Sequence, residues 1–358
     1  MNRSQIRILT FAILIVAIII AIFSGSKTTT PTSTYPHNYG EGYYLYKGEV
    51  PHFFTHQIIN NPKKAFQSKL SHHFDKDCIT HNELKNFLQE MYNNNFCLVD
   101  IFDVVKVDEN GASLKDLYVP LGKKPFLLSF DDMSYDNSGM GLSDKIILDE
   151  NGEFASLTKA NEPQIEYDKE FVCIIEDFIK DHPDFSCRNA RAIICPTGYD
   201  GILGYRINKT GYSREKDIEE IKPLIEKLKS LNYHFGCHTY NHIQVCYQSD
   251  NVLYADLKKY QDEIISVIGE TPIFCFPCGS GVTKGSKLDI LKQFGYKIFF
   301  CVGDAKTQEK NNVVFLKREV LNGIALRNYQ NEYSPFFETA KVYDHENRKI
   351  KFPFKIKR

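Results

Sequence analysis

The chain has 358 residues, of which 42% are hydrophobic and 25% charged, and its formal net charge is −1 at pH 7. This composition excludes a largely disordered chain, and the length suits one large domain or two ordinary ones. A net charge near zero neither requires nor excludes a nucleic-acid partner, and we expect none.

Residues 1–26 are predicted to lie outside the folded domain. Two arginines precede a continuous apolar run at 8–23, which is slightly shorter than the ~20 residues that a spanning helix prefers. The pattern predicts a signal anchor, or a signal peptide cleaved near Ser24–Ser26, with the rest of the chain exported. A Ser/Thr/Pro-rich linker at 27–44 and one domain at 45–358 follow. We therefore expect a single-pass cell-membrane protein with its domain outside, or a secreted protein.

Ten cysteines in an exported chain would ordinarily predict a disulfide framework. Here the spacings are irregular, and many cysteines lie in apolar, strand-like runs such as FCLVDI, FVCII and AIICP. Cysteine behaves as a small hydrophobic residue in such runs, so we expect mostly buried free thiols.

From about residue 45 onward, strand patterns alternate with helix patterns. Thr80 and Glu83 form a capping box before apolar residues at helical spacing, which predicts a helix. Asn151-Gly152 between two apolar segments predicts a β-hairpin over 145–157. The other predicted elements are strands at 96–105, 124–130, 190–196, 233–237, 273–277, 297–302 and 313–320, and helices at 171–183, 214–232, 253–269 and 288–295.

Repeated strand–helix units with short links imply an α/β fold of parallel strands covered by helices. A closed or nearly closed (β/α) barrel is the natural arrangement for this many units, and an open doubly wound sheet is the alternative. In both arrangements, the loops after the carboxyl ends of the strands build the site.

Chemistry-bearing residues follow three of these strands. Asp131 and Asp132 end one strand, HTYNH (238–242) follows another, and PCGSG follows a third. On one helical turn, His238 and His242 would face the same side, at the reach needed for one metal ion. Two imidazoles and one carboxylate leave a fourth position open, as in a catalytic zinc site. Alone, an HxxxH pair is a weak signal, and it lacks the glutamate of zinc proteases.

Adjacent acids usually mark a turn, a helix cap or a solvated edge. At the end of a buried strand, however, a cation offsets their repulsion and gives each a separate role. Asp132 would bind the metal, and Asp131 would stay ionised and take a proton from a water that the cation activates.

These residues resemble the polysaccharide deacetylases of the NodB-homology type, carbohydrate esterase family 4. SFDD looks like that family's TFDD motif, in which the first Asp is the base and the second binds the metal, here Asp131 and Asp132. HTYNH matches H[ST]xxH, which makes His238 and His242 the imidazole ligands. HFFTHQII resembles the family's opening LxYHxI, and FCFPCG its third motif, with Pro277 in the matching place.

The resemblance implies a distorted (β/α) barrel in the deacetylase-like domain at 45–358. It also implies Zn²⁺, or another divalent cation such as Co²⁺ or Ni²⁺. The implied reaction is metal-dependent removal of acetyl groups from N-acetylated sugars of peptidoglycan, chitin or exopolysaccharide. Gly279 matches the third motif, and a backbone N–H near Cys278 would stabilise the oxyanion.

The chain departs from the family pattern at several positions. Met133 replaces a Gly, Cys275 occupies the position of an Arg that orients the base, and Cys278 replaces a Tyr. Arg318 in FLKREV is the candidate for the missing orienter. A late LxH motif, which supplies the acid for the leaving amine, is absent from the sequence, and His345 is a weak substitute. A glycan- and metal-binding pseudoenzyme is therefore the alternative function.

Two further segments carry open alternatives. The loop at 197–212 either lines a sugar groove with Tyr199, Tyr205 and Arg206 or is held by its own aromatic side chains. CFPC (275–278) has the spacing of a thioredoxin-type motif, but the glycines after it argue against the helix that such a motif opens. Residues 133–170 look like an insertion beside the site.

Overall fold

The computed structural model describes residues 41–135, 139–158, 163–279 and 281–350. The predicted signal segment and most of the linker lie outside these residues. Within the described ranges, no helix is both long and apolar enough to cross a membrane.

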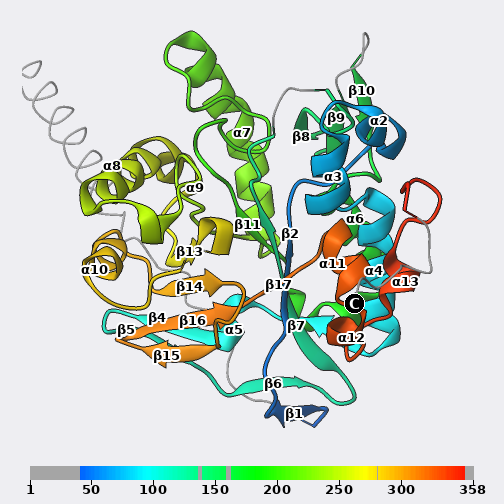
Figure 1. The fold of residues 1–358 in the computed structure, drawn as a ribbon, viewed down its shortest axis with the longest axis horizontal. Coiled ribbons are helices and arrows are strands. Elements are labelled where there is room, and N and C mark those ends of the chain that lie inside the picture. The colour runs from blue at the N-terminus through cyan, green and yellow to red at the C-terminus, as the bar shows by residue number, and fades with distance from the viewer. Residues whose placement is uncertain (1–40, 136–138, 159–162, 280, 351–358) are drawn as a thin grey trace, which may run out of the picture. The chain divides into compact units, whose positions relative to one another are not determined.

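Parallel strands form the centre of the domain (Figure 1). The first sheet has the order β12-β11-β7-β2-β17, with β3 also paired to β7, and all its pairs are parallel. Its strands are β2 (His52–Thr55), β3 (Phe96–Leu98), β7 (Lys124–Asp131), β11 (Ile193–Cys195), β12 (His234–Phe235) and β17 (Glu319–Val320). The second sheet comprises β13 (Ile273–Cys275), β14 (Ile298–Cys301), β16 (Val313–Lys317) and the antiparallel edge strand β15 (Gln308–Lys310).

The edges of the two sheets meet at two places. A parallel bridge between Cys237 and Phe274 joins the end of β12 to β13. On the other side, the chain runs from β16 through Arg318 directly into β17, so that one extended segment changes partner from β14 to β2. The parallel α/β architecture is confirmed. The expected closed barrel is not, because in the described part of the chain no sheet pairs continuously around to its own first strand.

Helices cover the outer faces of the strands (Figure 1). In α4 (His81–Asn93), Thr80 accepts from Glu83 N, and the Glu83 carboxylate accepts from Thr80 N, which confirms the capping box. The longer helices are α6 (Phe171–Asp181), α7 (Tyr212–Ser230), α8 (Asp250–Tyr260) and α10 (Ser286–Gln293). Three of them, α6, α7 and α10, lie within a few residues of the prediction. The single helix predicted over 253–269 is instead divided into α8, a π-helical segment (Gln261–Ile265) and a last short helix. The shorter ones are α2 (Pro62–Gln67), α3 (Ser71–Asp77), α5 (Ile101–Val104), α9 (Ser266–Ile268), α11 (Gly323–Asn328), α12 (Gln330–Tyr333) and α13 (Thr339–Val342).

The single strand predicted over 96–105 is wrong in its second half. After β3 the chain forms the short helix α5, because the Asp100 carboxylate accepts from Phe102 N at 2.7 Å and caps it. Two antiparallel strand pairs lie nearby. They are β4 (Val105–Asp108) with β5 (Gly111–Leu114), and β1 (Tyr43–Tyr46) with β6 (Leu117–Pro120).

The insertion after β7 forms a small antiparallel sheet of β8 (Lys145–Leu148), β9 (Phe154–Thr158) and β10 (Gln164–Glu166). Its β8–β9 turn confirms the predicted hairpin, and Gly152 adopts φ +77° there. Asn60, which follows β2, donates to Glu166 at 2.6 Å. The insertion is therefore joined to the segment that follows β2.

Two apolar clusters lie on opposite faces of the strands. One packs the outer faces against the helices, and the other, which includes Leu127, Ile193, Cys275 and Leu316, lies on the inner faces of both sheets. All ten cysteines are free, and only Cys246 and Cys278 are not buried. The prediction of buried free thiols is therefore confirmed for most of them.

Candidate functional site

The two adjacent aspartates of the first motif point to different surroundings. Asp131 is the last residue of β7 and is only 2% exposed. Asp132 adopts φ +56°, a left-handed conformation that Asp tolerates better than most residues, and its side chain is about one-third exposed. Met133, in place of the family's Gly, buries its side chain in the outer core. The residue with a left-handed conformation is thus Asp132 and not residue 133. The turn therefore accommodates a methionine where the family has a glycine.

Asp132, His238 and His242 come together as the sequence predicted. Asp132 Oδ1 lies 3.6 Å from His238 Nε2 and 3.5 Å from His242 Nε2. The three ligand atoms lie within 4.8 Å of one another. Among the described residues, buried Oδ1 has no hydrogen-bond partner. An orphaned carboxylate oxygen that faces two imidazole nitrogens fits a divalent cation.

The two histidines do not lie on a helical turn, which corrects the expected local structure. Thr239 and His242 both have left-handed φ values, +58° and +52°. The loop is held instead by the buried Asp256 carboxylate, which accepts from Tyr240 N at 2.6 Å and from Asn241 N at 2.9 Å. The spacing therefore predicted that these two side chains lie together, but for the wrong geometric reason; their role as metal ligands stays a prediction.

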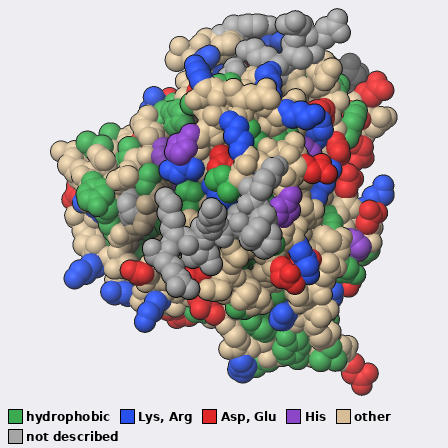
Figure 2. All heavy atoms as spheres, turned by 45° about the vertical axis from the view of Figure 1, so that its right-hand side comes forward, with side chains coloured by type: hydrophobic (Ala, Val, Ile, Leu, Met, Phe, Trp, Pro, Cys, Tyr) green, Lys and Arg blue, Asp and Glu red, His purple; other side chains and the backbone are tan. Residues whose placement is uncertain are grey.

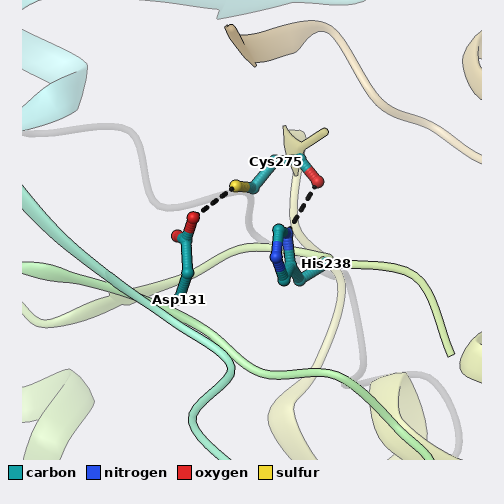
Figure 3. A group of neighbouring side chains, drawn as sticks. All are labelled: Asp131, His238 and Cys275. Carbon is teal, nitrogen blue, oxygen red and sulfur yellow. Dashed lines mark hydrogen bonds between the residues drawn. The ribbon is translucent and has the colours of Figure 1, made fainter. Parts of the chain in front are cut away.

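The orientation of His238 is fixed by the neighbouring strand. Its Nδ1 donates to the backbone carbonyl of Cys275 at 3.0 Å (Figure 3). This bond leaves Nε2 facing Asp132. Burial opposes a charge on this ring, but Cys275, Asp131 and Asp132 outweigh it and raise the pKa of His238 to about 10. The groups around His238 thus favour a positive charge at this place. A bound cation would supply such a charge as well as a proton does.

Arg318 holds Asp131, the predicted base. Its Nη1 and Nη2 donate to Asp131 Oδ1 and Oδ2, each at 2.8 Å, and both side chains are almost fully buried. Arg318 also donates to Ser129 Oγ at 3.1 Å, and its guanidinium lies over the Phe54 ring. Burial alone would raise the pKa of Asp131, but Arg318 and His238 outweigh it and hold that pKa well below its usual range. Asp131 is therefore ionised, and the orienter predicted at Arg318 makes the expected contact.

A second cluster of metal-ligand residue types overlaps the first, namely Asp131, His238 and Cys275. Both carboxylate oxygens of Asp131 are already bound by Arg318, and the Cys275 sulfur lies 2.7 Å from Arg318 Nη2. A cation there would stand beside a guanidinium, so the Asp132 cluster is the better site.

His56 is the site residue that the motif search missed. It directly follows β2 and is partly exposed. It is close enough for its charge to lower the pKa of both Asp131 and His242. The expected substitute, His345, instead bonds Ala340 O at 2.7 Å beside α13. The signal for His56 was present in HFFTHQII, which resembles the family's opening LxYHxI.

The loop at 197–212 was predicted either to line a sugar groove or to be held by its own side chains, and its three named residues differ in this respect. Tyr205 is buried in the core, with Lys145 over its ring, and Arg206 bonds the carbonyls of Asp200 and Tyr135. These two residues hold the loop, which corrects their assignment to a groove. Tyr199 is 45% exposed and stays a prediction.

The third motif forms a short turn after β13. Pro277, Cys278 and Gly279 make one 3₁₀ turn, in which Cys278 is exposed and has φ +53°. Their predicted role toward the oxyanion stays a prediction. Cys275 ends a buried strand and opens no helix, which argues against the thioredoxin-type alternative.

The candidate metal site is partly open to solvent. The side chains of Asp132 and His242 are each 31% exposed. A cavity of about 780 Å³ lies apart from them, lined among others by Tyr46, Val50, His52, Leu117 and Lys317, and by none of the metal-site residues. The candidate centre therefore opens to solvent at the carboxyl ends of the strands.

A family comparison agrees with the resemblance stated above. Residues 194–328, which are less than half of the chain, match the family model of polysaccharide deacetylases. The match includes His238, His242 and Arg318 but not the aspartate pair. No curated protein matches the chain.

Solved structures of deacetylases are similar to this chain at low identity. The deacetylase PplD of Streptococcus pyogenes is 16% identical, over 77% of this chain and 93% of its own, with a TM-score of 0.46. A de-N-acetylase from Aggregatibacter actinomycetemcomitans is 16% identical, over 76% and 95%, with a TM-score of 0.45. IcaB from Ammonifex degensii is 13% identical, over 79% and 95%, with a TM-score of 0.41.

Proposed function

We propose that this protein is a metal-dependent hydrolase that removes acetyl groups from N-acetylated sugars of a cell-surface polysaccharide, peptidoglycan or exopolysaccharide. The observation that carries the proposal is the unpartnered Asp132 Oδ1 between two imidazole nitrogens, beside an ionised and buried Asp131. The partial exposure of Asp132 and His242 supports a polymeric substrate, because a sugar within a long chain can reach these side chains.

Asp132, His238 and His242 would hold the cation, with Zn²⁺ as the first choice for two imidazoles and one carboxylate. When bound there, such a cation supplies Lewis acidity, which polarises the acetyl carbonyl and acidifies water.

Asp131 is the base in this proposal. The Arg318 fork keeps its carboxylate ionised and oriented, so it accepts a proton from the attacking water. The water oxygen forms a bond to the acetyl carbon, and the bond from that carbon to nitrogen breaks. The products are acetate and a free amino sugar.

His56 is the proposed acid for the leaving nitrogen. Departure of the amine requires a proton, and His56 is a partly exposed imidazole whose charge acts on both Asp131 and His242. Arg318 and His56 thus fill the two roles whose family motifs are missing. This argues against the pseudoenzyme alternative.

Charge on the surface gives no competing indication. On the face drawn in Figure 2, basic and acidic side chains are interspersed and do not gather into one basic patch. The formal net charge of −1 agrees with this, and a glycan partner suits such a surface better than a nucleic acid.

The test is acetate release from N-acetylglucosamine oligomers and from peptidoglycan by the purified protein, with and without chelator and added Zn²⁺. Chelator-sensitive release that Zn²⁺ restores is expected. Asp131→Asn should lower kcat by about 10³-fold while metal content is unchanged. Stoichiometric metal binding without acetate release from either substrate would instead support the glycan-binding alternative.

His56 is tested separately by His56→Ala. A loss of about 10²-fold in kcat with unchanged metal content is expected for a general acid. Wild-type turnover by this variant would remove His56 from the mechanism and leave the rest of the proposal standing.

A further inference from the structure

Residue 275 touches both halves of the site. Its backbone carbonyl accepts from His238 Nδ1 at 3.0 Å, and its Sγ donates to Asp131 Oδ2 at 3.3 Å (Figure 3). We propose that the Cys275 thiol is a positioning residue for the base, a third point of attachment that fixes the plane of the Asp131 carboxylate. The inference deepens the proposed function and rests on it for its kinetic test.

The thiol has a defined donor and a defined acceptor. Arg318 Nη2 lies 2.7 Å from Cys275 Sγ and donates to the sulfur. The S–H group is then available to Asp131 Oδ2.

A third contact adds something that the guanidinium fork lacks. The two parallel bonds from Arg318 define the line between the charged groups, but they permit the carboxylate and the guanidinium to tilt together. Cys275 approaches from β13, a different strand from the segment that carries Arg318. Contacts from two strands remove that tilt, and a base that is tilted transfers protons less effectively.

The surrounding residues leave room for sulfur at this place. Cys275 is fully buried, and its neighbour in the inner core is the Cys195 thiol. On the strand between them, a Cβ atom at Gly236 would stand 2.9 Å from Cys195 Sγ. Position 275 is where the family resemblance places an Arg. Here the small thiol lets the Arg318 guanidinium, from the junction of β16 and β17, reach Asp131.

Infrared spectroscopy tests the contact without any activity. The S–H stretching band of Cys275 is isolated as the difference between the wild-type protein and Cys275→Ala. In Asp131→Asn the carboxylate acceptor becomes a weaker amide acceptor, so this band should move to higher frequency. Cys97, equally buried in the same inner cluster, gives the control band through Cys97→Ala, and that band should stay in place. A Cys275 band that does not move in Asp131→Asn overturns the contact.

Kinetics test the positioning role. Cys275→Ala should lower kcat by about tenfold with unchanged KM and metal content, since a hydrogen bond to a charged group is lost. Cys275→Ser restores a donor and should keep kcat within about threefold of wild type. Cys97→Ala controls for the loss of one buried sulfur, and thermal unfolding of each variant checks that it is folded.

The outcomes separate the two proposals. Equal kcat in Cys275→Ala and wild type, or equal losses in the Ala and Ser variants, would refute the positioning role. If wild-type protein with full metal content releases no acetate, the proposed function fails, and the infrared shift then decides the thiol contact by itself.

Discussion

Two buried arginine–carboxylate pairs in this domain are alike in form and differ in how completely they are satisfied. Both pairs have two hydrogen bonds: Arg348 bonds Glu83 side-on through Nε at 2.6 Å and Nη2 at 2.7 Å, and Arg318 bonds Asp131 end-on through Nη1 and Nη2. Glu83 also accepts from the backbone N–H groups of Thr80 and Asp344. The Glu83 pair joins α4 to the end of the described chain, with every carboxylate oxygen doubly bonded.

The Asp131 pair stands among atoms that lack such partners. Within the described residues, Arg318 Nε and Asp132 Oδ1 are buried without a hydrogen bond. An uncompensated buried polar atom destabilises the fold, so a site that contains several is selected for something other than stability. A buried arginine–carboxylate pair alone therefore does not indicate a functional site. The buried atoms without hydrogen bonds around the Arg318–Asp131 pair do indicate one.

Breaking the site pair should give the largest effect on activity. In Arg318→Met the base loses its orientation and its counter-charge, so kcat should fall by about 10²- to 10³-fold. Steady-state acetate release, normalised to bound metal, measures this. The double variant Arg318→Met/Asp131→Asn removes the buried charge and should regain stability but no activity. Near-normal turnover in Arg318→Met would contradict the role given to this residue.

Breaking the structural pair should affect folding alone. Arg348→Met leaves Glu83 buried without its partner and should lower the free energy of unfolding by about 3–5 kcal/mol. Urea unfolding measures the loss, and kcat per folded molecule should match wild type. The control Arg348→Met/Glu83→Gln should recover part of the stability. A changed kcat in folded Arg348→Met would show that the two pairs are coupled.

A third buried carboxylate, Glu170, has no basic partner among the contacts described. It therefore extends the comparison to a buried carboxylate whose effect on stability depends on pH. Burial raises the pKa of Glu170 from 4.5 to about 7, Glu166 adds to the rise, and hydrogen bonds from Tyr135 and Phe171 N only partly oppose it. Because the folded-state pKa exceeds the unfolded value, this group favours folding below pH 4.5, and its contribution is lost as the pH rises through about 7.

Glu170→Gln should therefore flatten the loss of stability between pH 5 and pH 8, a difference of about 3 kcal/mol from this group alone. Unfolding curves at the two pH values measure it. Gln keeps an acceptor for the Tyr135 hydroxyl, so structure at pH 5 should be unchanged. Parallel pH profiles for variant and wild type would show that Glu170 titrates normally.

The smallest effect concerns the cap that Glu83 completes. Thr80→Ala removes the acceptor for Glu83 N and should lower the free energy of unfolding by about 1 kcal/mol, without loss of activity. Thr80→Ser keeps the hydroxyl and is the matched control. An equal loss in both variants would assign the effect to the threonine methyl group.

The sequence was sufficient for features that depend on neighbours in the chain. The capping box at Thr80, the Asn151-Gly152 hairpin and the order of strands and helices are local patterns, and the structure confirms them. The aspartate pair and the HTYNH histidines could be placed together because parallel strands end at one edge.

Contacts across the sheets were harder to predict. Arg318 was identified only because the orienting Arg of the third family motif is absent and this residue was the candidate to replace it. Nothing in FLKREV shows that the strand changes its pairing partner there. The sequence placed Cys275 at the position of the family's Arg, but nothing in it indicated that the thiol would contact Asp131. Tyr205 and Arg206 were misplaced because a loop's polar residues bond its own backbone as readily as a ligand.

The junction at Arg318 also sets when the protein can become active during its synthesis. The base and its orienter are separated by 187 residues, and β11, β13 and β14 are made between them. A ribosome-bound chain that has completed the aspartate pair and both histidines still lacks the counter-charge of its base. Under the proposed function, deacetylation would therefore wait until the last parallel strand has docked.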